Sequence, residues 1–453
     1  MALEIITVDE VLKACNGCLV NGTSTTEISG VSIDTRTVEA GDFFIAISGK
    51  KYNGHSFLPD ACRKGAAGVI VSESVKNLPK DKVVIRVTNT VSALQDIAGY
   101  YRSRFSVPVV GITGSNGKTT TKEMAASILS RKLRTLRNPG NFNNEIGVPL
   151  TLLRINSLHQ VCVLEIGMNK AGEAYRLAGI VKPEIGVITN TGSAHIGHFK
   201  SVEEIAVAKA ELLAEVRGTC ILNSDDEHFR LLKSKCSGKI VTFGLEKTAD
   251  FCADSISELS GGIMFRLNGG FEVRLRASGY HNVYNALASI AVASCLDMGK
   301  EEIVRGLEDF EPLPMRGESV ICGTIEVIND TYNANPDSVK AAIRLLQKKK
   351  GRKIAVIADM CELGEKADEF HRKTGKFIAG HSVDVLFTTG HFAGMAGEAA
   401  MQEGMKEVFL CEGKQELISK LLSMVKPYDI ILVKGSRAMG MEEVVKEIVR
   451  RKG

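Results

Sequence analysis

A short turn of glycine and small polar residues, at 114–117, separates two regular segments of the chain. The apolar run at 107–112 predicts a buried strand, and the apolar spacing at 124–129 predicts a helix after the turn. At such a junction the backbone N–H groups of the helix N-terminus point at an anion, and the helix dipole adds to their attraction. Lys118 is placed to reach terminal phosphates, and the Thr119 hydroxyl to hold Mg²⁺. The turn is therefore predicted to bind a nucleoside triphosphate.

The glycine spacing departs from the strict phosphate-loop pattern. That pattern requires a glycine five residues before Gly117, and Ile112 stands there, so the spacing is Gly114-x-x-Gly117-Lys118-Thr119. An ordinary strand-to-helix turn, which also favours glycine and serine or threonine, is the alternative. Lys-Thr-Thr directly after the last glycine is not needed for a turn, and this favours phosphate binding.

Two further polar residues follow apolar runs that predict neighbouring strands of a parallel sheet. Glu165 ends the run 161–165, and His195 lies in the loop after the run 185–189. Ligands gather at the carboxyl ends of such strands, and a carboxylate buried there is costly unless it meets a cation. Taken alone, His195 is more often a satisfied polar residue than a ligand. Together with Thr119, the two side chains indicate a Mg²⁺ site, because Mg²⁺ uses few protein ligands beside phosphates and water.

Lys209 and an asparagine-rich stretch are less informative by themselves. Lys209 lies in the helical pattern 201–211, where a lysine is ordinarily solvated on the surface. Residues 138–144 contain four asparagines, which is more than a turn needs. This density suggests hydrogen bonds to a polar substrate.

The elements that must position these residues are those of several α/β units, since 453 residues are too many for one core. Apolar runs alternate with helical patterns, as in doubly wound parallel sheets. Strands are predicted at 3–6, 43–47, 68–71, 161–167, 185–189, 218–223, 325–330, 353–358, 383–388, 407–410 and 429–433, a hairpin at 262–277, and helices at 8–15, 57–64 and 91–104. Asn335-Pro336 is a helix start.

We therefore predict an α/β protein of three domains. A small α/β N-terminal domain would cover 1–106, a central phosphate-loop domain with a parallel sheet would cover 107–314, and a C-terminal Rossmann-like domain would cover 315–453.

Composition narrows the class of protein. Its 44% hydrophobic and 24% charged residues are typical of a soluble globular protein, and the net charge of +4 suits anionic substrates. No stripe of lysine or arginine interleaved with aromatic residues is present, so nucleic acid is not an expected partner. Residues 1–17 lack the pattern of a signal peptide, and no run approaches the ~20 apolar residues of a membrane helix. We expect a cytoplasmic protein whose eleven cysteines are free thiols.

Seven short motifs come in the order seen in the Mur ligase family, which makes the peptide stem of peptidoglycan, and the chain resembles that family over its whole length. The motifs are Thr-Gly-Ser-Asn-Gly-Lys-Thr-Thr-Thr at 113–121, Gly-Asn-Phe-Asn-Asn-Glu-Ile-Gly-Val-Pro at 140–149, Leu-Glu-Ile-Gly-Met at 164–168, Ala-His-Ile at 194–196, Ala-Lys-Ala-Glu at 208–211, His-Asn-Val-Tyr-Asn-Ala-Leu-Ala at 281–288 and Met-Arg-Gly-Glu at 315–318. The short glycine spacing is the family's own. The runs at 330–338, 359–364 and 433–437 resemble the branch that adds a dipeptide.

The resemblance implies an ATP-dependent, ADP-forming ligase. It would join D-alanyl-D-alanine to a UDP-N-acetylmuramoyl-tripeptide through an acyl phosphate, in cytoplasmic peptidoglycan precursor synthesis. ATP, two Mg²⁺ ions and a CO₂-derived carbamate on Lys209 would be its cofactors. We expect a monomer, without nucleic-acid or membrane partners.

Roles for individual residues follow from the same resemblance. The expected catalytic residues are Lys118, Glu165, His195 and Lys209. The expected metal ligands are Thr119 and Glu165 for one Mg²⁺, and His195 and the Lys209 carbamate for the second. The residues expected to hold ATP are Thr113, Gly114, Ser115, Asn116, Gly117, Lys118, Thr119, Asn282, Asn285, Arg316 and Asp330. Substrate contacts are expected from Ser32, Asp34 and Arg36 at the uridine diphosphate end, from Asn141, Asn143 and Asn144 at the sugar nucleotide, and from Asn333, Asn335 and Arg437 at the dipeptide.

Three alternatives stay open from the sequence. A sibling ligase would add a single amino acid, although the run 332–336 argues against it because siblings differ there. A folate polyglutamate-type ligase shares the core, but the stretch 138–144 and the uridine-type first domain fit it poorly. A catalytically silent ATP-binding scaffold is the third, and the intact set of four catalytic residues argues against it.

Overall fold

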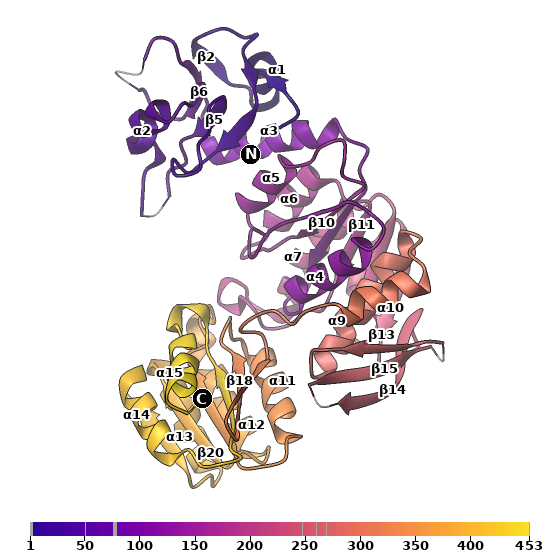
Figure 1. Cartoon of the computed structure of the whole chain (residues 1–453), viewed down its shortest axis with the longest axis vertical. Helices are drawn as coiled ribbons and strands as arrows, with labels where there is room; N and C mark the ends of the chain where they lie inside the picture. Colours follow the sequence, from indigo (N-terminus) through magenta and orange to yellow (C-terminus); the bar gives the residue numbers. More distant parts are fainter. Residues whose placement is uncertain are drawn as a thin grey trace.

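The computed structural model describes residues 3–49, 51–75, 79–246, 248–259, 261–268 and 270–452. Within these residues, sheets of five, nine and six strands follow one another along the chain, and each carries helices (Figure 1). The predicted α/β class is confirmed. The domain boundaries after residues 106 and 314 stay predictions.

The first sheet has the strand order β2-β7-β6-β5-β4, with β2 antiparallel to β7 and the other neighbours parallel. A short antiparallel ribbon of β1 and β3 lies apart from this sheet. The strands are β1 (Ile6–Thr7), β2 (Cys18–Asn21), β3 (Glu27–Ile28), β4 (Gly30–Ser32), β5 (Asp42–Ile45), β6 (Gly68–Val71) and β7 (Val83–Arg86). The helices are α1 (Val8–Cys15), the 3₁₀ turn η1 (Gly54–Phe57), α2 (Leu58–Arg63) and α3 (Thr90–Ser103).

The strand predicted at 3–6 is wrong, because only Ile6–Thr7 is paired as a strand. Its partner β3 is two residues long, so the ladder cannot continue further. Leu3 is buried nevertheless, and its N–H donates to the Ser29 carbonyl at 2.7 Å. The apolar run reflects burial and not a strand.

Helix α3 connects the first sheet to the central one. Its Tyr101 side chain is fully buried; the hydroxyl donates to the Ile155 carbonyl at 2.8 Å and accepts the Glu4 N–H at 2.9 Å. One apolar cluster therefore includes Ile6 and Val11 of the N-terminal part and Leu152 of the central part.

The central sheet has the order β16-β15-β14-β13-β12-β11-β8-β10-β9. Its strands are β8 (Val109–Thr113), β9 (Thr135–Arg137), β10 (Val161–Glu165), β11 (Ile185–Ile188), β12 (Thr219–Asn223), β13 (Lys239–Gly244), β14 (Phe251–Leu259), β15 (Gly262–Leu267) and β16 (Glu272–Leu275). Strand β8 lies between β10 and β11 in parallel register, with Glu165 opposite Ile112 and Ile188 opposite Thr113. The carboxyl ends of these three strands therefore meet, and the chain passes from one side of β8 to the other there, as ligand-binding edges of open α/β sheets do.

The helices of the central part cover this sheet. They are α4 (Lys118–Leu129), α5 (Gly147–Leu152), α6 (Glu173–Val181), the 3₁₀ turn η2 (Ile196–His198), α7 (Val202–Ala214), α8 (Phe229–Ser234), α9 (Tyr280–Cys295) and α10 (Lys300–Glu308). The predicted hairpin is confirmed as β15 and β16, and β14 extends it by a further antiparallel strand.

The C-terminal sheet has the order β17-β18-β22-β19-β20-β21, with only the edge strand β17 antiparallel among the described strands. Its strands are β17 (Glu318–Cys322), β18 (Ile325–Asp330), β19 (Lys353–Ala358), β20 (Val385–Thr389), β21 (Val408–Cys411) and β22 (Ile430–Lys434). Its helices are α11 (Pro336–Gln347), the 3₁₀ turn η3 (Gly364–Lys366), α12 (Ala367–Ala379), α13 (His391–Gln402), α14 (Lys414–Met424), the 3₁₀ turn η4 (Arg437–Met439) and α15 (Glu442–Lys452). The five predicted strands of this part are confirmed to within two residues at each end.

The predicted helix start at Asn335-Pro336 is also confirmed. The Asn335 side chain accepts the Ser338 N–H at 2.9 Å, and the Ser338 hydroxyl accepts the Asn335 N–H at 3.0 Å, which is a reciprocal cap with proline at the first helical position. This cap fixes the direction of α11 toward the central part.

An apolar cluster joins the central and C-terminal parts. It includes Ile196 and Ile205 on the central side and Met360 and Leu363 on the C-terminal side. In the part of the chain that the structure describes, no helix is long and apolar enough to cross a membrane. The eleven cysteines are free thiols, as predicted.

Candidate active site

The turn between β8 and α4 is held by the loop that follows the neighbouring strand β11. The Ser115 N–H donates to the Asn190 carbonyl, and the Asn116 N–H to the Asn190 side-chain oxygen, both at 2.9 Å. The Thr189 hydroxyl donates to the Asn116 carbonyl at 2.6 Å. Helix α4 itself has no side-chain cap, so the N–H groups of its first turn are left for another acceptor. An uncapped helix N-terminus beside a lysine is suited to a phosphate group.

Two positions in this turn require glycine. Gly114 has φ +152° and Gly117 has φ +82°. A Cβ at Gly114 would lie 1.9 Å from the Thr189 hydroxyl oxygen, and a Cβ at Gly117 would lie 2.2 Å from the Asn285 side-chain oxygen. Ile112, where the strict pattern has glycine, is fully buried in β8. The spacing therefore satisfies the geometry of this turn without a third glycine.

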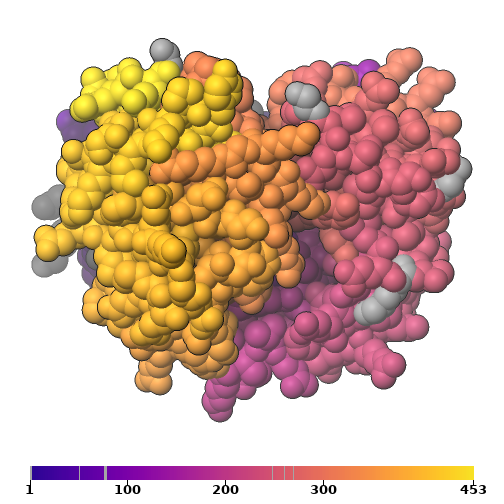
Figure 2. Space-filling view, turned by 90° about the horizontal axis from the view of Figure 1, so that it is seen from below, coloured from indigo at the N-terminus to yellow at the C-terminus, as the bar shows by residue number. Residues whose placement is uncertain are grey.

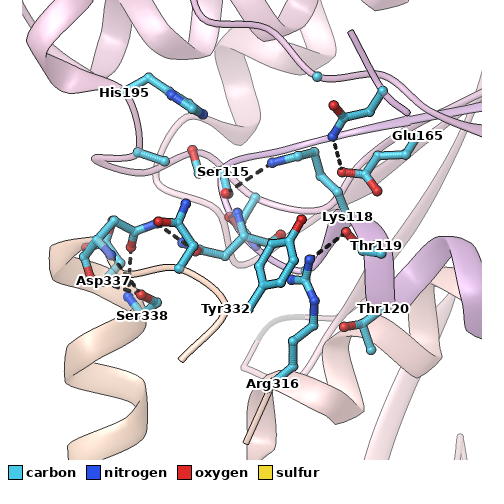
Figure 3. A pocket seen from close by; sticks show the side chains of 18 of the residues that line it. Ser115, Lys118, Thr119, Thr120, Glu165, His195, Arg316, Tyr332, Asp337 and Ser338 are labelled. Atoms are coloured by element: carbon cyan, nitrogen blue, oxygen red, sulfur yellow. Dashed lines mark hydrogen bonds between the residues drawn. The ribbon is translucent and has the colours of Figure 1, made fainter. Parts of the chain in front are cut away.

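Lys118 folds back over the turn, and its ammonium donates to the Gly114 carbonyl at 2.7 Å. It also donates to the Ser115 carbonyl at 3.3 Å (Figure 3). Burial lowers the pKa of Lys118, while the nearby Glu165 carboxylate opposes that shift. Among the described residues, the ammonium is hydrogen-bonded to neutral carbonyls alone. A phosphate oxygen would be a stronger acceptor for it.

Glu165 lies at the end of β10 with only 2% of its surface exposed. One carboxylate oxygen, Oε1, accepts from Asn143 Nδ2 at 2.6 Å, but the buried Oε2 has no hydrogen-bond partner among the described residues. Such an oxygen is costly to bury unpaired. The side chain lies beside Thr119, so the pair fits a Mg²⁺ ion that takes its remaining ligands from phosphate and water (Figure 3).

Replacing Glu165 by alanine is expected to raise the Mg²⁺ concentration needed for half-maximal phosphate release by at least about 10-fold, because a carboxylate ligand is lost. The measurement is phosphate release against Mg²⁺ concentration at saturating substrates. Glu184→Ala is the control, since this exposed glutamate precedes β11 at the opposite edge of the sheet. An unchanged Mg²⁺ requirement in Glu165→Ala would show that Glu165 is not a ligand.

His195 meets Glu362 of the C-terminal part. His195 Nδ1 lies 2.7 Å from Glu362 Oε2, and the Gly197 N–H donates to the Glu362 carbonyl at 2.9 Å. The adjacent histidine ring lowers the pKa of the Glu362 carboxyl, and His198 and Lys118 lower it further. Sequence reasoning missed Glu362, although the run at 359–364 had drawn attention for its resemblance.

Lys209 is buried in α7, with 1% of its surface exposed. The interpretation of this residue as a solvated surface lysine is wrong, because α7 turns it inward. Its ammonium makes no hydrogen bond or ion pair with a described residue. Burial, with a smaller effect of Lys118, lowers the pKa of Lys209 well below its usual value, so the neutral amine is favoured.

The C-terminal part contributes two cationic side chains to the lining of a cavity. Arg316 donates to the Thr119 hydroxyl at 3.0 Å, and its guanidinium stacks on the Tyr332 ring at 3.7 Å (Figure 3). Lys434 is buried and donates to Asp330 at 2.6 Å. Sequence reasoning missed Tyr332 and Lys434, although both lie in runs noted for their resemblance.

Further bonds join α11 to the central part. The N–H and hydroxyl of Ser193 both donate to Asp337 at 2.8 Å, and Asn335 donates to the Asn116 side-chain oxygen at 2.8 Å. The side chain of Asn335 is thus bonded on both its oxygen and its nitrogen in this arrangement. Its expected contact with the dipeptide stays a prediction.

A cavity of about 780 Å³ opens between the central and C-terminal parts. Seen from below, these parts meet across a groove, the C-terminal one in orange and yellow and the central one in pink (Figure 2). Predicted site residues that line the cavity are Ser115, Asn116, Gly117, Lys118, Thr119, Asn141, Asn143, Asn144, Glu165, His195, Asn282, Asn285, Arg316, Asp330, Asn333, Asn335 and Arg437. Predicted residues outside this lining are Thr113, Gly114, Lys209, Ser32, Asp34 and Arg36.

Several asparagines of 138–144 form hydrogen bonds with the protein backbone, a role that the sequence did not indicate. Asn138 is fully buried and exchanges hydrogen bonds with the Glu165 backbone, at 3.0 Å in both directions. Asn144 accepts the N–H groups of residues 146 and 147 at the start of α5. Among the asparagines of this loop that line the cavity, Asn141 has no side-chain bond to a described residue.

Asn282 and Asn285 lie three residues apart in α9. Asn285 donates to the Asn282 side-chain oxygen at 3.2 Å and accepts from the Thr121 hydroxyl at 3.3 Å. Both are buried at the wall of the cavity. Their role at the nucleotide base stays a prediction.

Ser32, Asp34 and Arg36 bond to one another in a turn after β4. The Ser32 hydroxyl donates to the Asp34 carbonyl at 2.9 Å, and Arg36 pairs with the Asp34 carboxylate at 2.6 Å. This pairing lowers the pKa of Asp34 to about 2. The turn belongs to the N-terminal part and not to the central cavity. A ligand that contacts both this turn and the central cavity would have to be long.

Three segments of the chain match known protein families: residues 27–102 the Mur ligase family catalytic domain, 112–293 the Mur ligase middle domain and 315–437 the Mur ligase glutamate ligase domain. A UDP-N-acetylmuramoyl-tripeptide–D-alanyl-D-alanine ligase of Bacillus subtilis is 35% identical over 98% of each chain. The chain belongs to the Mur ligase family. The ligase of the same name from Escherichia coli is 32% identical, again over 98% of each chain.

Solved Mur ligases have the same fold. A crystal structure of MurF from Acinetobacter baumannii matches all of both chains with a TM-score of 0.92 at 32% identity. MurF from Thermotoga maritima, solved in complex with ADP, matches 93% of this chain and 97% of its own with a TM-score of 0.83 at 28% identity. The likeness thus extends through all three parts of this Mur ligase.

Proposed function

We propose that this protein is an ATP-dependent ligase that joins D-alanyl-D-alanine to UDP-N-acetylmuramoyl-tripeptide and releases ADP and phosphate. The full-length similarity to relatives of that name supports the choice of substrates. The observation that most supports ATP binding and phosphoryl transfer is the uncapped N-terminus of α4, with Lys118 folded over it and the buried, unpaired Oε2 of Glu165 beside it.

The reaction needs activation of a carboxylate, because a free carboxylate is a poor acylating agent. Transfer of the γ-phosphoryl group of ATP to the tripeptide carboxylate breaks the bond to the bridging oxygen and gives ADP and an acyl phosphate. The amine of the dipeptide attacks the carbonyl carbon, loses a proton, and expels phosphate. Lys118 would leave the carbonyls of Gly114 and Ser115 and neutralise charge on the transferred group.

Two Mg²⁺ ions would supply further charge neutralisation when bound. Thr119 and Glu165 would hold one ion, and His195 with a carbamylated Lys209 the other. Carbamylation joins the neutral amine to CO₂ and releases one proton. The burial of Lys209 supports it, because it favours the unprotonated amine that reacts with CO₂.

The rest of the substrate would extend away from the cavity. We place the uridine diphosphate end at Ser32, Asp34 and Arg36 in the N-terminal part. Asn141, Asn143 and Asn144 would lie along the sugar, at the cavity wall. Since the reaction consumes ATP, we place it in the cytoplasm, and we expect a monomer.

Arg437 is our candidate for the dipeptide carboxylate. It lines the cavity with its side chain 56% exposed, and it bonds to Glu442 at 3.0 Å. Arg437→Ala is expected to raise the KM for the dipeptide by about 10- to 100-fold, as loss of a hydrogen bond to a charged group would. The KM for ATP should change far less.

Steady-state kinetics with each substrate varied in turn would measure this difference. Arg451→Ala is the matched control, since Arg451 is an exposed arginine on α15 that pairs with Glu447 at 3.5 Å, away from the cavity. Equal rises in both KM values would remove Arg437 from the dipeptide site.

ATP turnover that depends on both the tripeptide nucleotide and the dipeptide would distinguish a ligase from a silent ATP-binding scaffold. A protein that binds ATP but releases no phosphate with either substrate would be the scaffold.

A further inference from the structure

Glu362 is a cavity residue to which the proposed function gives no task. It follows β19 in the C-terminal part, whereas His195 follows β11 in the central part, yet the two side chains lie 2.7 Å apart. The ring of His195 points into the cavity (Figure 3). Its Nδ1 is buried, and no described residue offers it a hydrogen bond of normal geometry, so the Glu362 carboxylate is the charged group beside it.

The backbone around this contact is strained on both sides. His195 and Glu362 each have φ +64°, a left-handed conformation that residues other than glycine adopt rarely. Such strain persists only where the surrounding structure holds it, and it gathers at functional sites. Here the strained residue of each loop is the one whose side chain contacts the other loop: His195 in the central part and Glu362 in the C-terminal part.

The two loops fit against each other closely. A Cβ at Gly197 would lie 2.5 Å from the Gly364 nitrogen, so a larger residue would separate them. Beneath the polar pair, Ile196 and Leu363 are 2% and 1% exposed and belong to one apolar cluster. The contact between Glu362 and His195 therefore forms only when the C-terminal part is docked on the central part.

A histidine that binds a metal commonly has its other ring nitrogen beside a carboxylate, which fixes the tautomer and the ring orientation. We propose that Glu362 is a positioning residue that holds the His195 ring through Nδ1 and leaves Nε2 for the second cation. Docking of the C-terminal part thereby completes that cation site. The inference rests on the proposed function only in taking His195 as a ligand of the second cation.

The test uses the full chain, Mn²⁺ in place of Mg²⁺, and a non-hydrolysable ATP analogue. Electron paramagnetic resonance of free Mn²⁺ gives the number and affinity of the bound ions without turnover. Wild type should bind two ions. Glu362→Gln should weaken the second by about 10- to 100-fold and leave the first unchanged, which is the size of effect expected for a group supporting a metal ligand. Glu362→Asp should recover part of the loss.

Glu365→Gln is the control, because Glu365 is an exposed glutamate three residues further along the same loop. It should bind both ions as wild type does. Two equally tight ions in Glu362→Gln, or a single ion in wild type, would overturn the inference. Either result leaves the ligation assay untouched, so the proposed function would stand or fall separately.

A double-mutant cycle separates positioning from a direct or general structural effect. If Glu362 acts through His195, Glu362→Gln should cost nothing further in a His195→Ala background. Thermal unfolding of each variant shows whether it is folded. If Glu362→Gln does not fold, Glu362→Asp replaces it in the cycle. Fully additive losses of Mn²⁺ affinity would mean that Glu362 acts independently of His195, and the positioning role would be wrong.

Discussion

Lys118→Ala is expected to nearly abolish ligation, with a fall in kcat of about 10²- to 10³-fold, which is typical for loss of a preorganised group that stabilises transferred charge. The Lys118 ammonium bonds to the backbone carbonyls of its own turn, and the residue lines the cavity. The mutant should therefore fold, with a thermal unfolding midpoint close to that of wild type.

Phosphate release in the presence of all substrates measures the effect. Lys132→Ala is the control, because Lys132 is an exposed lysine just beyond the end of the same helix α4. Near-normal turnover in a well-folded Lys118→Ala would contradict the assignment of residues 114–119 as the phosphate site.

Lys209→Ala is expected to be nearly inactive, and millimolar acetate or another short carboxylate should restore part of the activity. The carboxylate would enter the space left by the side chain and replace the carbamate oxygens. Rescue is a better test than mass spectrometry, because carbamates are labile. Lys233→Ala, at an exposed lysine of α8, should keep wild-type activity and gain nothing from acetate.

Stability gives a second readout at Lys209. In CO₂-free buffer Lys209 is the unmodified amine, and burial lowers its pKa in the folded protein, so between that pKa and the usual one the unfolded chain binds a proton that the folded chain does not. The free energy of unfolding therefore rises with pH through that interval. Lys209→Met should be more stable than wild type at neutral pH and should lose this dependence.

Unchanged activity in Lys209→Ala would contradict the role of the carbamate.

Much of the fold could be predicted from local patterns. The strands at 325–330 and 353–358 are largely buried apolar runs, and the helix cap at Asn335 involves only residues 335–338. Each element could therefore be recognised without knowing which distant segments pack against it. The strand at 3–6 was mistaken because burial without a long partner gives the same apolar run as a strand.

The site was harder to predict where it depends on distant parts of the chain. Glu362 and His195 are 167 positions apart and meet only through docking of two sheets, so no local pattern indicates the pair. Asn190 is also far in sequence from the phosphate turn, and its backbone and side chain hold that turn from the neighbouring strand β11 of the same sheet. Asn138 shows the opposite error, since a polar residue in a predicted binding loop is used to hold the strand that carries Glu165.

The identity of the joined substrates tests the central claim most directly. Purified protein would be given ATP, Mg²⁺, UDP-N-acetylmuramoyl-tripeptide and D-alanyl-D-alanine, and the nucleotide products would be weighed by mass spectrometry. We expect the pentapeptide nucleotide, with one ADP and one phosphate for each bond formed. D-alanine alone should react roughly 10⁴-fold less efficiently, because it leaves groups placed for the second residue unpaired. Efficient ligation of a single amino acid to a shorter nucleotide, with the dipeptide ignored, would contradict the account.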